Sequence, residues 1–154
     1  MLVKNLKNKE KIMKRLAIIS ILCLSLVGCS SAPDPITVVI KPIGNEMKYE
    51  TTQFEVLKGQ EVTIIMDNIA TEEMMKHNVV VLNDESKVNE VGMAAMSAPG
   101  YIPENEAIIA ATAIAEAGQQ TRITFTAPKK TGTYVYICTF PGHFSMMRGE
   151  MIVK

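Results

Sequence analysis

Apolar and polar side chains alternate, or form short β-branched runs, along most of the chain from Ile36 to Lys154. Both patterns are typical of strands. Turn-forming segments such as Lys58–Gln60 and Pro128–Gly132 separate the runs, at the spacing of roughly 8–12 residues that favours an antiparallel sandwich or barrel. We expect strands at Ile36–Ile40, Tyr49–Val56, Glu61–Met66, His77–Leu82, Thr121–Ala127, Thr133–Cys138 and Gly149–Lys154.

The pattern changes between Asp84 and Gly118. Val88 to Ala95 is rich in residues that favour helix, and Gly100 to Pro103 interrupts that stretch. The Ile- and Ala-rich segment from Ala107 to Ala115 fits a helix or a strand, because short apolar runs do not distinguish the two. We therefore predict an all-β fold with a helical insertion between strands.

The first 28 residues have the pattern of an export signal. Met1 to Arg15 is polar and basic, and the apolar run from Leu16 to Val27 is 12 residues long, whereas a membrane-spanning helix needs roughly 20. A basic segment followed by a short apolar run is typical of a secretory signal peptide. An ordinary signal peptide and an uncleaved membrane anchor are both compatible with a basic segment followed by a short apolar run.

The end of the apolar run narrows the interpretation. Leu26-Val27-Gly28-Cys29 resembles the lipobox of bacterial lipoproteins, which implies cleavage before Cys29 and attachment of lipid to its sulfur. We expect a signal peptide at 1–28, a lipid-anchored tether at 29–35 and one domain at 36–154, held at a bacterial membrane and facing the periplasm or the cell exterior. In a Gram-negative cell, Ser30 would favour the outer membrane.

The part of the chain after the predicted signal peptide is acidic. The whole chain has 16 basic and 16 acidic side chains, but six basic groups and one acidic group lie in residues 1–28. The remaining 126 residues therefore hold 10 basic and 15 acidic groups, a net charge of −5. An acidic domain without Trp argues against nucleic acid as a partner. Its size fits one hydrophobic core, and we expect a monomer.

The rare residue types gather into one candidate site. Cys23 leaves with the signal peptide and Cys29 takes the lipid, so Cys138 is the folded part's one cysteine, and His77 and His143 are its two histidines. Exported domains normally oxidise their cysteines in pairs, so an unpaired thiol is either inert or has a chemical role.

Residues 138–149 place a thiol at Cys138, an imidazole at His143 and a thioether at Met147 on one short loop. Pro141-Gly142 would let this loop turn back, and His77 could lie opposite it. One thiolate, two imidazoles and a weak axial Met describe a blue-copper electron-transfer site.

The loop resembles that of the azurins and the related auracyanins, whose Cys-x4-His-x3-Met spacing it matches. Met75-Lys76-His77-Asn78 and Gly44-Asn45-Glu46-Met47 are also similar to azurin segments. The resemblance implies a Greek-key cupredoxin sandwich with one copper ion, three equatorial ligands from His77, Cys138 and His143, and Met147 as a distant axial ligand. Met146 competes for the axial role.

The resemblance also implies supporting roles. Asn78, Thr139 and Phe140 would surround the cysteine sulfur and fix the donor-bearing segments. Azurins have Gly before the first His, whereas this chain has Lys76, whose backbone carbonyl could still approach the metal. An apolar docking patch around His143 would consist of Met47, Met75, Met93, Pro141, Phe144 and Met146.

The implied function is one-electron transfer by a copper centre cycling between Cu(I) and Cu(II), not catalysis. Expected partners are a c-type cytochrome, a membrane quinol-oxidising complex, or a terminal reductase or oxidase. Copper storage, delivery or sensing is the alternative, since the chain has 11 methionines. A copper enzyme fits less well, because four protein ligands leave no open position for substrate.

Overall fold

The computed structural model describes residues 32–154, so the predicted signal peptide and Cys29 lie outside the described residues. The strands are β1 (Ile36–Ile40), β2 (Gln53–Val56), β3 (Glu61–Asp67), β4 (Val80–Leu82), β5 (Ile108–Ala111), β6 (Gln120–Thr126), β7 (Gly132–Ile137) and β8 (Arg148–Val153). Between β4 and β5 come the 3₁₀ helix η1 (Glu85–Lys87), the helix α2 (Val88–Ala95) and the 3₁₀ turn η2 (Pro99–Tyr101). No helix within residues 32–154 has the length and apolar character needed to cross a bilayer.

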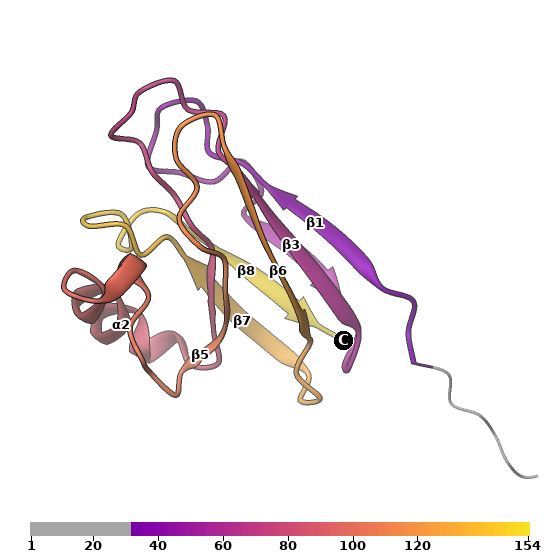
Figure 1. Ribbon diagram of the computed structural model, residues 1–154. Coiled ribbons are helices and arrows are strands. Elements are labelled where there is room, and N and C mark those ends of the chain that lie inside the picture. Colours follow the sequence, from indigo (N-terminus) through magenta and orange to yellow (C-terminus); the bar gives the residue numbers. More distant parts are fainter. Residues whose placement is uncertain (1–31) are drawn as a thin grey trace, which may run out of the picture. The chain divides into compact units, whose positions relative to one another are not determined.

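The strands form two sheets, in the orders β1-β3-β6 and β2-β8-β7-β4-β5, which lie as two layers (Figure 1). The predicted all-β fold with a helical insertion is confirmed. The sheets are mixed, because β1 pairs with β3 and β2 with β8 in parallel. Between β1 and β3 the chain crosses to the second sheet, where it forms β2, and this crossover lets β3 run in the same direction as β1.

The strand β7 is buried on both faces, which explains its nearly continuous apolar sequence. Tyr134 and Tyr136 point into the core between the sheets, and Cys138 directly after the strand belongs to the same core. Val135 and Ile137 point to the other face, where they pack with α2 and β4. The alternation of the strand thus places the thiol of Cys138 on the inner side of the sandwich.

Two predicted strands are shorter than expected. Tyr49 lies before β2 and forms only an isolated bridge with Pro42, and His77 forms one with Ala115. In the second case the ladder is interrupted because the backbone N–H of Val79 donates to the Thr112 hydroxyl, at 3.0 Å. The undecided segment is settled as β5, which pairs antiparallel with β4.

The helical insertion covers the outer face of the five-stranded sheet beside β5 and β7 (Figure 1). The insertion packs tightly on the loop after β7 at Gly92, because a Cβ there would overlap the ring of Phe144. Only glycine fits at this point, so the ring of Phe144 packs directly on the helix backbone. The insertion therefore supports the loop that carries His143.

Candidate metal centre

Three donor side chains converge in the core. The Sγ of Cys138 lies 3.8 Å from Nδ1 of His77 and 3.6 Å from Nδ1 of His143, and the possible ligand atoms of the three residues all lie within 4.8 Å of one another. His77 and Cys138 are fully buried, and His143 is 4% exposed. This spacing would let one ion contact all three atoms at the bond lengths that imidazole and thiolate ligands form.

The loop from β7 to β8 folds back on itself, as its Pro-Gly pair predicts. Gly142 has φ 84°, a conformation that glycine adopts readily, and the N–H of His143 donates to the Phe140 carbonyl at 3.0 Å. At the base of the loop the N–H of Cys138 donates to the Met147 carbonyl at 2.9 Å. The turn and the closed base together fix where His143 lies relative to Cys138.

A reciprocal pair of hydrogen bonds joins this loop to the segment that carries His77. Nδ2 of Asn78 donates to the Thr139 hydroxyl at 2.8 Å, and the N–H of Thr139 donates to Oδ1 of Asn78 at 2.8 Å. The Thr139 hydroxyl in turn donates to the carbonyl of Tyr101, at 2.6 Å. All the polar groups of Asn78 and Thr139 used here are buried, so breaking either bond would leave a costly unpaired group.

Sequence reasoning missed three supporting residues. Asn68 is fully buried, and its Nδ2 donates to the carbonyls of Met75 and Ala115, at 2.7 and 2.9 Å. The Tyr49 hydroxyl donates to the Asn78 carbonyl at 2.5 Å. Tyr101 has φ 59°, unusual for a residue with a side chain. A lone Asn at the end of an apolar strand was the one available signal.

Burial keeps the donor groups uncharged without a metal. Desolvation raises the pKa of the Cys138 thiol to about 11, although the backbone N–H groups of Asn78 and Phe140 offset part of this by donating to the sulfur. Desolvation, with a smaller contribution from His143, lowers the pKa of His77 to about 4. Burial also lowers the pKa of His143. Neutral imidazoles are ready to bind a cation, which would also compensate a buried thiolate.

The two methionines at the end of the loop differ sharply in burial. Met147 is fully buried in the same core cluster as Cys138, whereas Met146 is 55% exposed. Lys76, which precedes His77, directs its side chain to Glu116 through an ion pair of 2.7 Å. Its ammonium group is thus engaged away from the three donor residues.

Three of the six predicted docking residues share one pocket. Met47, Met75 and Met146 line a cavity of about 340 Å³. Met93 is 58% exposed on α2, Pro141 is exposed, and Phe144 is half-buried against Gly92.

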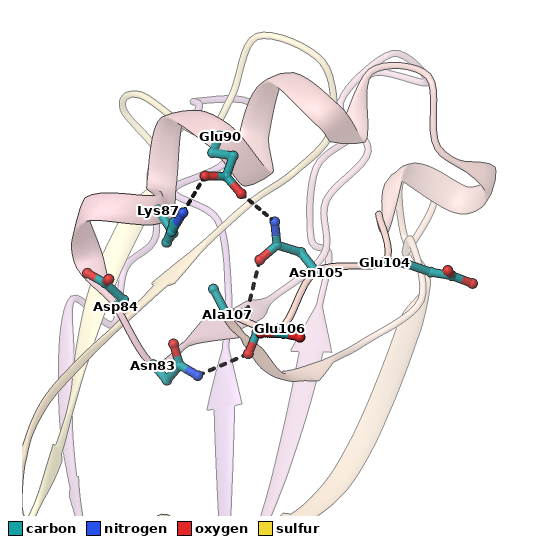
Figure 2. Close-up of a pocket in the computed structure, with 8 residues that line it drawn as sticks. All are labelled: Asn83, Asp84, Lys87, Glu90, Glu104, Asn105, Glu106 and Ala107. Carbon is teal, nitrogen blue, oxygen red and sulfur yellow. Dashed lines mark hydrogen bonds and ion pairs between the residues drawn. The ribbon is translucent and has the colours of Figure 1, made fainter.

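A larger pocket, of about 500 Å³, lies beside η1 and α2 and contains none of the three donor residues (Figure 2). Its polar groups bond one another: Glu90 accepts from Lys87 at 2.6 Å and from Asn105 at 2.9 Å. The side chain of Asn83 donates to the Glu106 carbonyl at 3.0 Å. These contacts join the insertion to the segment before β5, so we interpret the polar groups of this pocket as structural.

The chain is similar to known copper proteins. A family model described as copper-binding proteins of the plastocyanin/azurin family matches residues 36–154. The chain belongs to the plastocyanin/azurin family of copper-binding proteins. Membership implies electron transfer at a copper site, and the His77, Cys138 and His143 group with Met147 nearby is like a type 1 copper site.

Individual cupredoxins agree closely with the chain. Auracyanin-A of Chloroflexus aurantiacus is 30% identical over 156 residues, which are 90% of this chain and 94% of that protein. The solved structure of auracyanin A, a blue copper protein of the same organism, has a TM-score of 0.71 at 34% identity and covers 78% of this chain and 99% of that one.

Two further relatives span much of the domain. An azurin of Pseudomonas fluorescens biotype C is 32% identical over 118 residues, 71% of this chain and 92% of that protein. The outer membrane protein H.8 of Neisseria gonorrhoeae is 28% identical over 113 residues, 70% of this chain and 62% of that protein.

The lowered pKa of His77 predicts acid sensitivity of the copper-free cupredoxin. Above pH 6.5 the imidazole is neutral in both states. As the pH falls toward about 4, it protonates in the unfolded chain but not in the folded one. The free energy of unfolding should therefore fall over this window by about 3 kcal/mol from His77 alone, and His143 changes it in the same direction. Urea denaturation at pH 7, 6, 5 and 4 measures this. A His77→Leu variant should show a shallower dependence; an equally steep one would contradict the assignment.

Proposed function

We propose that this protein carries single electrons outside the cytoplasm through one copper ion held by His77, Cys138 and His143, with Met147 as a weak axial ligand. The observation that carries the proposal is the convergence of three buried donor atoms within 4.8 Å of one another. Copper bound there would supply one-electron chemistry, because soft sulfur suits Cu(I) and imidazole suits Cu(II).

The surroundings favour transfer of electrons over a reaction on a substrate. The donors are buried in the core, with His77 and Cys138 fully covered and His143 4% exposed, so a substrate would have little room to reach the ion. The Asn78–Thr139 pair and the closed loop base hold the donor-bearing segments in place. A rigid donor set keeps rearrangement between two oxidation states small, which suits an electron carrier.

Burial supports Met147 over Met146 as the axial ligand, since Met146 is 55% exposed and Met147 fully buried. We also propose that the N–H groups of Asn78 and Phe140, which already lower the pKa of the Cys138 thiol, stabilise the thiolate in the metal-bound protein. The Lys76 carbonyl is the proposed further contact on the His77 side, as its side chain is engaged by Glu116.

Copper loading tests the proposed ligand set. The purified protein with one Cu(II) should show an intense visible band that bleaches on one-electron reduction and returns on oxidation. Cys138→Ser should abolish the band, because a hydroxyl does not replace the thiolate. Met147→Gln should keep a band but lower the reduction potential, since a harder oxygen donor favours Cu(II). Met146→Gln is the matched control and should change neither. A Met146 effect equal to that of Met147 would reverse the axial assignment.

We propose that redox partners dock on the apolar surface around the donor-bearing loop, formed by Met47, Met75, Met93, Pro141, Phe144 and Met146. His143 is the donor residue with measurable exposure, 4%, so it is the side from which an electron reaches the surface in the fewest steps. Small, transient contacts are typical of redox encounters, and methionine adapts to different partner shapes. A c-type cytochrome, a quinol-oxidising complex or a terminal reductase or oxidase would suit such a surface.

A charge introduced into this patch should slow electron exchange with a physiological partner. Met93→Glu places a carboxylate on the 58% exposed helix position while leaving the visible spectrum of the copper protein unchanged. The rate is measured by stopped-flow mixing with a partner oxidoreductase, and Asn89→Glu on the same helix, outside the patch, is the control. Equal rates for both variants and the parent would remove Met93 from the docking surface.

We further propose that the domain is exported and anchored at a bacterial membrane through lipid on Cys29, by a tether at 29–35. The lipobox-like Leu26-Val27-Gly28-Cys29 supports this, as does a relative described as an outer membrane protein.

The anchor predicts a defined N-terminus and location. Mass spectrometry of the protein from a bacterial membrane fraction should give Cys29 as the first residue, carrying a diacylglyceryl group. Cys29→Ala should move the protein out of the membrane fraction or block its processing, whereas Cys23→Ala, six residues earlier in the apolar run, should change neither. An unlipidated Cys29 in the membrane-bound protein would disprove the anchor.

A further inference from the structure

Three methionines from distant parts of the sequence share one small pocket beside the donor-bearing loop. Met47, Met75 and Met146 line a cavity of about 340 Å³, and its other lining residues are Asn45, Glu46 and Lys48. Met146 is 55% exposed, and Met47 and Met75 are half-buried. Half of the pocket's residues thus offer a thioether sulfur, and solvent reaches the pocket.

Backbone contacts hold two of these methionines next to each other. Oδ1 of Asn45 accepts from the N–H groups of Thr71 and Glu72, at 2.8 and 3.3 Å, which ties the loop of Met47 to the segment before Met75. The N–H of Met75 then donates to the Glu72 carbonyl at 2.9 Å. The backbone segments that carry Met47 and Met75 are therefore held together by the fold.

The third methionine is fixed from the copper-loop side. The N–H of Met146 donates to the His143 carbonyl at 3.0 Å, and the Met75 carbonyl accepts from the buried Asn68 at 2.7 Å. Met75 lies two residues before His77, and Met146 three residues after His143. The pocket is therefore flanked in sequence by both buried imidazoles.

We propose that Met47, Met75 and Met146 form a second, surface site that binds Cu(I). Thioethers are soft donors that select Cu(I) over harder divalent ions, and the three methionines that line this cavity would together supply a trigonal set. The remaining polar side chains in the pocket add little net charge, because Glu46 and Lys48 form an ion pair of 3.5 Å.

The chemistry of this site differs from that of the buried set. A thioether carries no proton, so Cu(I) binds to the three methionines without releasing a proton or moving an electron. The buried set binds only after Cys138 loses its thiol proton to solvent. The surface site should therefore keep its affinity at mildly acidic pH, where the buried set loses affinity.

The proposal goes beyond electron transfer and does not depend on it. A surface site between the two imidazole-bearing segments is suited to receive Cu(I) from solution or from a donor protein. Docking of a redox partner requires only that these side chains be apolar, whereas binding of Cu(I) requires their sulfur. Methionine-to-leucine changes separate the two roles.

The test is an anaerobic titration of the purified copper-free protein with Cu(I), followed by NMR of ¹³C-labelled methionine methyl groups and of the Cys138 Cβ. The first equivalent should shift the Cys138 signal. The second should shift the methyls of Met47, Met75 and Met146 and leave those of Met74, Met93 and Met96, which are also exposed, in place. A second equivalent that fails to bind, or that shifts all exposed methionines alike, overturns the proposal. An unshifted Cys138 signal would instead contradict the buried copper site.

Met146→Leu, with the similarly exposed Met96→Leu as its control, gives the decisive comparison. Met146→Leu should weaken binding of the second Cu(I) by at least about tenfold. Changing a residue that only supports a metal ligand already costs about tenfold in affinity, so removing a ligand should cost at least as much. The visible spectrum of the Cu(II) protein should not change, because Met146 lies outside the buried donor set. A second Cu(I) held as tightly by Met146→Leu as by Met96→Leu would show that the three sulfurs are not its ligands.

Discussion

The rest of the site depends on the reciprocal hydrogen bonds between Asn78 and Thr139. They join two segments that lie 61 residues apart in sequence, and each segment contributes a donor directly beside the bonded residue, His77 beside Asn78 and Cys138 beside Thr139. Because both residues are buried, the bonds do not compete with water and hold the segments firmly. The position of His77 relative to Cys138 is therefore set by neighbours that do not themselves bind the ion.

The donors were predictable because their residue types are rare. One cysteine and two histidines in the folded part leave little choice of soft and imidazole donors. The spacing of Cys138, His143 and Met147 in the loop after β7 then indicates the methionine. The strand β1 was also predictable to the residue, since a proline and a β-branched run define it. In contrast, local patterns carry no information on direction, so the parallel pairing of β1 with β3 was not foreseen.

The missed features share one physical cause. The side chains of Tyr49, Asn68 and Thr112 all bond backbone groups far away in sequence, and no spacing rule identifies such partners. The ladder of β4 begins at Val80 because the hydroxyl of Thr112 takes a backbone N–H that a longer strand would need. The Ile- and Ala-rich run of β5 fits two periods by itself, and only its pairing with β4 decides between them.

The contact between Gly92 and Phe144 links two parts of the fold that are usually considered separately. The ring of Phe144 lies where any side chain at position 92 would be, so the donor-bearing loop and the helical insertion have complementary shapes at this point. A loop taken from a relative with a different residue at 144 would meet a helix shaped for phenylalanine. For the design of hybrid proteins, positions 92 and 144 therefore form one exchangeable unit, and the insertion must be transplanted together with the loop.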